Sequence, residues 1–96
     1  MKTAFIIKNN TIHDLGGHTI GSIKEHSILD SFGVIKGTFS EREIFNSHRN
    51  LLAIYDDQKI LNPKFEVVSH NDNVRKIISG ADGITLAAIW VLFFMG

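Results

Sequence analysis

Isoleucine recurs along this chain at a fixed interval of 16 residues, at Ile12, Ile28, Ile44 and Ile60. Each isoleucine is followed two positions later by an acid or an amide, at Asp14, Asp30, Asn46 and Asn62. A constant internal period predicts a repeat architecture in which each unit is one small supersecondary element. The units span residues 11–26, 27–42, 43–58 and 59–74, and the last unit loses the pattern towards its end.

The acid or amide of each unit predicts a type I turn. Asp and Asn side chains cap the backbone of such a turn, and glycine is favoured three residues later. The first two units have Gly17 and Gly33 at that position, whereas the third has Arg49, followed by Asn50, which tolerates positive φ. The fourth unit has Pro63 directly after its amide, where a fixed φ suits the turn.

Short β-branched or aromatic segments between these turns predict strands, at residues 19–23, 34–39 and 51–55. Polar pairs end these segments where two-residue hairpin turns belong: Asn9-Asn10, Glu25-His26, Glu41-Arg42 and Asp57-Gln58. Residues 5–8 are in register with 21–24, so the chain starts with the second half of a unit, as expected of a closed ring. One strand position is always small, at Gly21, Gly37, Ala53 and Ser69, which predicts that all units contact the same central element.

The segment from Ile84 to Met95 has no charged residue and is predicted to form that central element as a helix. A helix that is apolar on every face must be surrounded by protein or by lipid. Twelve residues give roughly 18 Å of helix, and a bilayer core is about 30 Å thick, so a buried core helix is favoured. Ser79 and Asp82 have capping-box spacing near its start, and the largest side chains, Trp90, Phe93 and Phe94, are predicted to be the most concentrated source of stability in the molecule.

These patterns predict one domain, residues 1–96, of mainly β class: four repeated 16-residue β-hairpins, or petals, around one apolar C-terminal α-helix. Residues 1–73 form the repeat region, and residues 74–96 form a linker and the helix. The fourfold Ile-x-Asp/Asn spacing, with its small position and terminal apolar helix, resembles the four-fold β-flower family of small bacterial proteins. The resemblance covers nearly the whole chain and implies petals around a central helix, but no biochemical activity; Arg49 and Phe65 depart from its regularity.

Composition limits the partners of the chain. Lys plus Arg and Asp plus Glu each number 10, so no net charge attracts nucleic acid, and no nucleic-acid partner is expected. The absence of cysteine excludes disulfides and thiol chemistry. The apolar run at residues 4–7 is too short for a secretory signal, and a cytoplasmic location is expected.

Candidate chemical groups fit structural roles better than catalytic ones. The five histidines, His13, His18, His26, His48 and His70, occupy five different positions of the unit, whereas a metal site on a ring would use equivalent positions. The alternative that these positions leave is a weak metal site formed by the pair His13 and His18, which would face each other across the first turn. Turn capping explains Asp14 and Asp30, and no phosphate loop, nucleophile elbow or zinc signature is present. We therefore predict no catalytic, cofactor-binding or metal-binding residue and no cofactor.

Three functions fit these observations. The first is a non-enzymatic structural or interaction module whose hairpin tips or sheet edges bind a protein partner or a second copy of the chain. The alternative is a membrane-associated protein with residues 84–95 inserted in lipid. The third is a small-ligand binder or an enzyme without a recognisable motif. For the aromatic side chains Phe32, Phe39, Phe45 and Tyr55, strand-core packing is favoured over a ligand surface.

Overall fold

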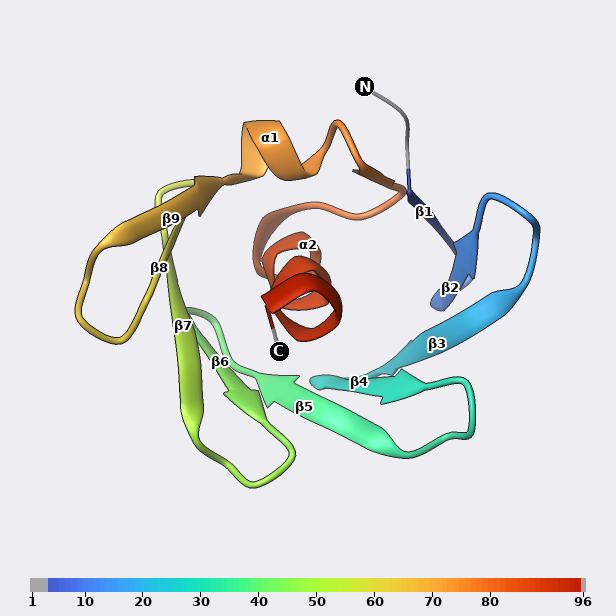
Figure 1. The fold of residues 1–96 in the computed structure, drawn as a ribbon. Helices are drawn as coiled ribbons and strands as arrows, with labels where there is room; N and C mark the ends of the chain where they lie inside the picture. Colours follow the sequence, from blue (N-terminus) through green and yellow to red (C-terminus); the bar gives the residue numbers. More distant parts are fainter. Residues whose placement is uncertain (1–3, 96) are drawn as a thin grey trace.

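The computed structural model describes residues 4–95, and in this range the chain is mainly β with a short C-terminal helix. The predicted mainly β class and the predicted C-terminal helix are both confirmed. Ten strands form one sheet, which curves around helix α2 (Gly83–Trp90) in Figure 1. The strands are β1 (Phe5–Lys8), β2 (Thr11–Asp14), β3 (Thr19–Lys24), β4 (Ser27–Asp30), β5 (Ile35–Phe39), β6 (Glu43–Asn46), β7 (Leu51–Asp56), β8 (Lys59–Leu61), β9 (Val67–His70) and β10 (Ile78–Ser79).

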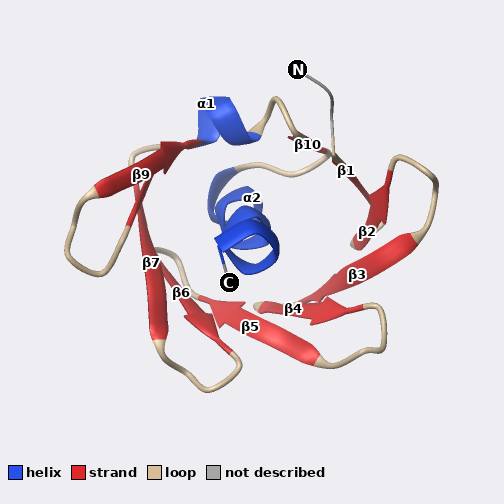
Figure 2. Cartoon of the chain, in the orientation of Figure 1, coloured by secondary structure: helices blue, strands red, loops and turns tan. Residues whose placement is uncertain are grey.

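The sheet follows the order of the chain except at its ends. Strands β1 to β9 are successive neighbours, and β10 lies beside β1 as a parallel strand, with Phe5 opposite Ile78. Among residues 4–95, β9 pairs only with β8 and β10 only with β1, so the strands do not close the ring. The short helix α1 (Asn71–Val74) occupies the gap, as Figure 2 shows. The sequence pattern predicted neither α1 nor β10, because the repeat has already ended there.

The same irregularity recurs in four antiparallel strand pairs. The register shifts between Ile12 and His13, between Ile28 and Leu29, between Ile44 and Phe45, and between Ile60 and Leu61. A β-bulge of this kind bends its strand and increases the local twist. The sheet therefore bends at regular intervals of the chain, which lets short strands surround a helix.

Three of the four two-residue turns contain residues with positive φ. Asn9 and Asn10 have φ of 52° and 61°, and Asp57 and Gln58 have 48° and 67°, which is the pattern of a type I′ hairpin turn. Glu25 also has positive φ. The turn at residues 41–42 differs, because Ser40 closes it: its N–H donates to the Glu43 carbonyl at 2.9 Å, and its hydroxyl accepts from the Glu43 N–H at 3.2 Å.

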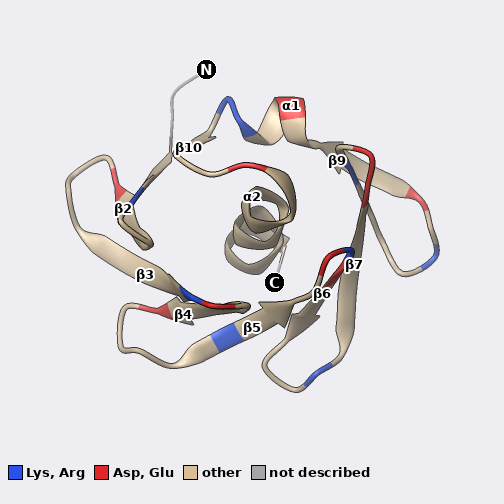
Figure 3. Cartoon of the chain, turned by 180° about the vertical axis from the view of Figure 1, so that it is seen from behind, with Lys and Arg blue, Asp and Glu red and all other residues tan. Residues whose placement is uncertain are grey.

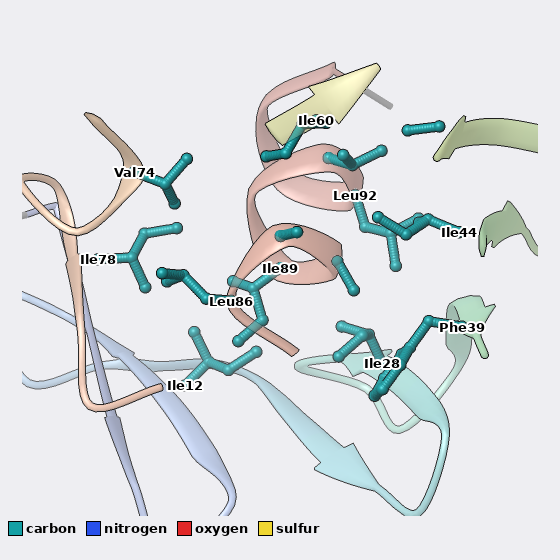
Figure 4. Close-up of a cluster of buried hydrophobic side chains, with 14 of the residues drawn as sticks. Ile12, Ile28, Phe39, Ile44, Ile60, Val74, Ile78, Leu86, Ile89 and Leu92 are labelled. Carbon is teal, nitrogen blue, oxygen red and sulfur yellow. The ribbon is translucent and has the colours of Figure 1, made fainter. Parts of the chain in front are cut away.

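The four repeated isoleucines form the wall of the core. Ile12, Ile28, Ile44 and Ile60 are fully buried, and Figure 4 shows them arranged around α2. Val74 and Ile78 are buried as well and cover the helix where the strands leave the gap. A fully buried isoleucine side chain contributes about 1.5–3 kcal/mol, so this wall is a large part of the stability of a small domain.

The central helix starts at Gly83, directly before the predicted start at Ile84, and it ends differently than the sequence indicates. Asp82 is its N-cap, and the Asp82 carboxylate accepts from the Gly83 N–H at 2.8 Å. The expected capping box is wrong, because Ser79 lies in β10. After Trp90 the helix continues as the π-helical turn η1 (Val91–Met95). Within residues 4–95, no helix is long and apolar enough to span a bilayer.

The helix is buried through its small and medium-sized residues, which corrects the prediction for its aromatic side chains. Leu86, Ala87, Ala88, Ile89 and Val91 are completely buried. Trp90 and Phe93 are only partly buried, and Phe94 is 46% exposed. Trp90 and Phe93 pack against the core from its side, and the Phe93 ring lies directly against Gly21 of β3. Phe5 contacts Phe93 and Phe94, with ring centroids 5.6 and 5.2 Å apart.

Two of the small strand positions show how close this approach is. A Cβ atom added at Gly21 would lie 2.9 Å from the Phe93 ring, and one at Gly37 would lie 2.6 Å from the Leu92 side chain. Both would also lie less than 3.0 Å from a carbonyl oxygen of the neighbouring strand. Ala53 is completely buried, whereas Ser69 in β9 is only partly buried. Close contact with the carbonyl oxygen of the neighbouring strand and with a side chain of the C-terminal helical segment together explains Gly21 and Gly37.

We predict that Gly37→Ala destabilises the chain by about 1–3 kcal/mol, because the added methyl group overpacks the interface between β5 and the helix. Urea unfolding followed by far-UV circular dichroism measures the change. Gly16→Ala is the matched control, because its nearest neighbour would be the exposed His18 ring at 3.1 Å, which can move away. Equal stability of the two variants would contradict the close approach.

Candidate functional site

The four long turns share one hydrogen-bond arrangement. In each turn the Oδ1 atom of the acid or amide accepts from the backbone N–H groups two and four residues later, at 2.8 to 3.0 Å; these residues are Asp14, Asp30, Asn46 and Asn62. The predicted turn capping is confirmed. The pKa of the Asp14 carboxyl is lowered, chiefly because the His18 N–H donates to it. These side chains stabilise the turns. The turns then fix the positions of the exposed residues that they contain.

The fourth residue of each turn has positive φ. Gly17 and Gly33 have φ of 85° and 80°, and Arg49 and Phe65 have 67° and 66°. In the third turn it is Arg49, and not Asn50, that adopts positive φ, and the Arg49 N–H closes the turn by donating to the Asn46 carbonyl at 3.0 Å. Left-handed backbone costs a residue with a side chain roughly 1–2 kcal/mol. Arg49 and Phe65 therefore occupy positions where glycine would be more stable.

Large apolar side chains are exposed on these turns. Phe32 is 88% exposed and Phe65 is 72% exposed, and Leu15 and Val34 are more than half exposed. We call these four residues the turn surface. Strand-core packing, predicted for four aromatic residues, is wrong for Phe32; it holds for Phe39, which is buried. On the free edge of the sheet, Val67 and Val68 of β9 are exposed as well.

Two grooves lie beside turns whose positive-φ residue has a side chain. The first, of about 400 Å³, is lined by Thr38, Phe45 and Arg49. The second, of about 340 Å³, is lined by Arg42, Glu43, Ile54 and Phe65. Ile54 and Phe65 stand 16 residues after Thr38 and Arg49, so the two grooves occupy related places on successive units. We call them the Arg49 groove and the Phe65 groove.

The guanidinium groups in the two grooves differ in their partners. Arg42 in the Phe65 groove donates to the Asp56 carboxylate at 2.9 Å. Among residues 4–95, Arg49 makes no side-chain hydrogen bond and no ion pair, whereas Arg75, the remaining arginine, pairs with two carboxylates. Arg49 is thus a cation without an internal counterion at the wall of a groove.

Three of the five histidine side chains, His13, His18 and His26, contact other groups. The His13 ring is 3.4 Å from the Thr19 hydroxyl, and the His18 ring is 3.4 Å from the Asp14 carboxylate. The His26 ring lies against Phe39, with centroids 5.6 Å apart. Over residues 4–95, no group of three or more His, Asp or Glu side chains has the geometry to hold a metal ion.

A polar cluster joins the two ends of the interrupted ring. The Arg75 guanidinium donates to Asp82, the N-cap of α2, at 2.8 Å, to Asp72 of α1 at 2.5 Å, and to Gln58 in the turn before β8 at 2.6 Å. This contact raises the pKa of Arg75, and the pKa of the Asp82 carboxyl is lowered, first by the Arg75 hydrogen bonds and then by the Gly83 N–H. The cluster therefore ties α1 to the turn before β8 and to the N-terminus of α2.

Asn71 connects the last repeat unit to the helix. Its N–H donates to the Gln58 carbonyl at 2.8 Å, which is the bond that Ile23, Phe39 and Tyr55 make at the same position of earlier units. Its side chain is completely buried and donates to the Gly83 carbonyl at 3.0 Å and to the Tyr55 hydroxyl at 3.3 Å. Burial raises the pKa of Tyr55, and the nearby Asp82 carboxylate raises it further.

Charges of both signs are distributed around the ring. Figure 3 shows acidic and basic segments interspersed among the strands and turns, and the sequence totals are equal. Comparison of the chain with protein-family models, with curated proteins and with solved structures gives no match. The candidate site is therefore defined by geometry alone: the turn surface and the two grooves beside it.

We predict that Phe65→Gly raises the free energy of unfolding by about 0.5–1 kcal/mol, because relief of the left-handed conformation outweighs the entropy of the added glycine. Thermal and urea unfolding measure the change. Lys64→Gly is the control: Lys64 has no positive φ, so glycine there only adds entropy to the unfolded chain and lowers stability. A less stable Phe65→Gly variant would mean that the ring stabilises the groove it lines.

We predict that Asp82→Asn lowers the melting temperature at neutral pH and that its difference from the unmodified chain begins to shrink only as the pH falls below about 4. A carboxyl whose pKa is lower in the folded chain stabilises the fold above its ordinary pKa and loses this contribution as the pH falls through the folded value. Melting curves from pH 7 to 2 measure the effect. Asp57→Asn, at an exposed turn, is the control. If the melting temperature of Asp82→Asn falls at low pH as much as that of the unmodified chain, the role of the Arg75 cluster is refuted.

Proposed function

We propose that this chain is a non-enzymatic interaction module in which four equivalent petals, mounted on the central helix, present their turns to a partner protein. The equal 16-residue spacing of the bulges and of the capped turns supports equivalence of the petals. Similarity to the four-fold β-flower family is part of this proposal. The partner is a second copy of the chain, because a net charge of zero leaves no overall repulsion between copies.

The observation that carries the proposal is the exposure of Phe32. The same turn position holds Gly16, His48 and Lys64 in the other units, so turn formation does not require an aromatic ring there. At 88% exposure Phe32 also contributes little to the core. Val34 and Ile35, on the same hairpin, are exposed next to it, and clustered apolar side chains on a surface are typical of protein contacts.

Two other functions have less support. Membrane association through residues 84–95 would require the helix to leave the core, where Leu86, Ile89 and Val91 are completely buried; only Phe94 and Met95 of this segment are exposed large apolar residues. For an enzyme that needs a metal ion, residues 4–95 contain no group of three or more His, Asp or Glu side chains that could hold one. Ligand binding has one specific observation in its favour, the Arg49 groove.

We predict that the chain self-associates in a concentration-dependent manner and that Phe32→Ser shifts it to the monomer, because the exposed ring is the largest apolar contact on the turn surface. Sedimentation velocity over a wide range of concentrations measures the shift. Lys64→Ser, at the equivalent position of the fourth unit, is the matched control and leaves association unchanged. A monomer at every concentration, or equal association of Phe32→Ser and the unmodified chain, would reject this function.

A further inference from the structure

The Arg49 groove combines three kinds of contact on the outer face of the sheet. Thr38 of β5 and Phe45 of β6 are cross-strand partners and therefore share one face. Their neighbours Phe39 and Ile44 are buried against the helix, so alternation along the strands directs Thr38 and Phe45 away from it. Arg49, in the turn that follows β6, forms the remaining wall.

The chain retains Arg49 against the preference of its own backbone. Two of the four turns have glycine at this position, and a side chain at φ of 67° is strained. The guanidinium makes no compensating bond within residues 4–95, while Arg42 and Arg75 are bound to carboxylates. Strained backbone at the wall of a groove, with an unpaired charge on it, is typical of a binding position.

We propose that the Arg49 groove binds a small organic carboxylate that has a flat apolar body. The carboxylate accepts two parallel hydrogen bonds from the Arg49 guanidinium, for which the planar fork is suited. The apolar body stacks against the Phe45 ring, and the Thr38 hydroxyl donates to the free carboxylate lone pair. A volume of about 400 Å³ lies within the usual range of small-molecule sites.

The Phe65 groove provides an internal contrast. It holds an arginine too, but Arg42 is neutralised by Asp56 at 2.9 Å, and Glu43 adds a negative charge to the lining. Such a groove does not attract an anion. Comparison of anion binding in the two grooves therefore distinguishes the effect of an unpaired guanidinium from the effect of the groove shape.

Phenylacetate is a suitable probe, and phenylacetamide is its neutral counterpart of the same shape. Titration followed by ¹H–¹⁵N NMR, with the Arg49 side-chain Nε signal resolved, is expected to show saturable shifts at Arg49, Thr38 and Phe45 for phenylacetate. The neutral amide binds at least about tenfold more weakly, since it cannot form the charge-assisted pair. Equal binding of the two probes, or no saturable shift with phenylacetate, would overturn the proposal.

Three variants complete the test. Arg49→Gln keeps a polar side chain and weakens phenylacetate binding at least about tenfold, whereas Arg42→Gln leaves it unchanged. Arg49→Gly also loses binding but melts at a higher temperature, so its lost binding is not the result of unfolding. Retained binding in Arg49→Gln would refute the site. These results are independent of self-association, which Phe32→Ser tests separately.

Discussion

The mutual burial of the apolar helix and the inner face of the sheet is the interaction on which the rest of this structure depends. A helix without a polar face cannot remain in water, and strands of two to six residues cannot enclose a dry core alone. Ile12, Ile28, Ile44 and Ile60 meet the helix from successive units, and its small residues Ala87 and Ala88 let them approach. Bulges, turns and grooves all follow from bending a sheet around so narrow an axis.

The parts of the fold that could be predicted from the sequence are those determined by local chemistry repeated at a fixed spacing. An Asp or Asn followed by a residue with positive φ specifies its turn within five residues, and the alternation around each isoleucine specifies the buried face. For this reason the turns at Asp14 and Asn46 were predictable. The segment from Asn71 to Asp82 was not, because α1 and β10 depend on long-range partners such as Tyr55 and Phe5.

Side-chain size was a poor guide to burial in this molecule. Trp90, Phe93 and Phe94 are the largest residues of the helical segment, yet none of the three is fully buried, whereas Ala88 and Ile89 are. Phe32 fails in the same way, since hydrophobicity alone suggests a core position and the turn places it in solvent. The candidate site could be predicted only as far as the turns. The groove requires Thr38, Phe45 and Arg49 to come together, which no sequence spacing indicates.

The repeat itself separates structural residues from functional ones. Each long turn is held by the backbone and by one side-chain oxygen, so its remaining side chains are free to differ between units. Where one unit has a residue that lowers stability and the other units do not, folding does not explain that residue. Arg49 and Phe65 replace glycine at positive φ, and Phe32 exposes an aromatic ring where Gly16 or Lys64 suffices. Because the other units hold different residues at each of these positions, turn formation alone does not explain Arg49, Phe65 and Phe32, and this is the reason for the binding roles proposed for this surface.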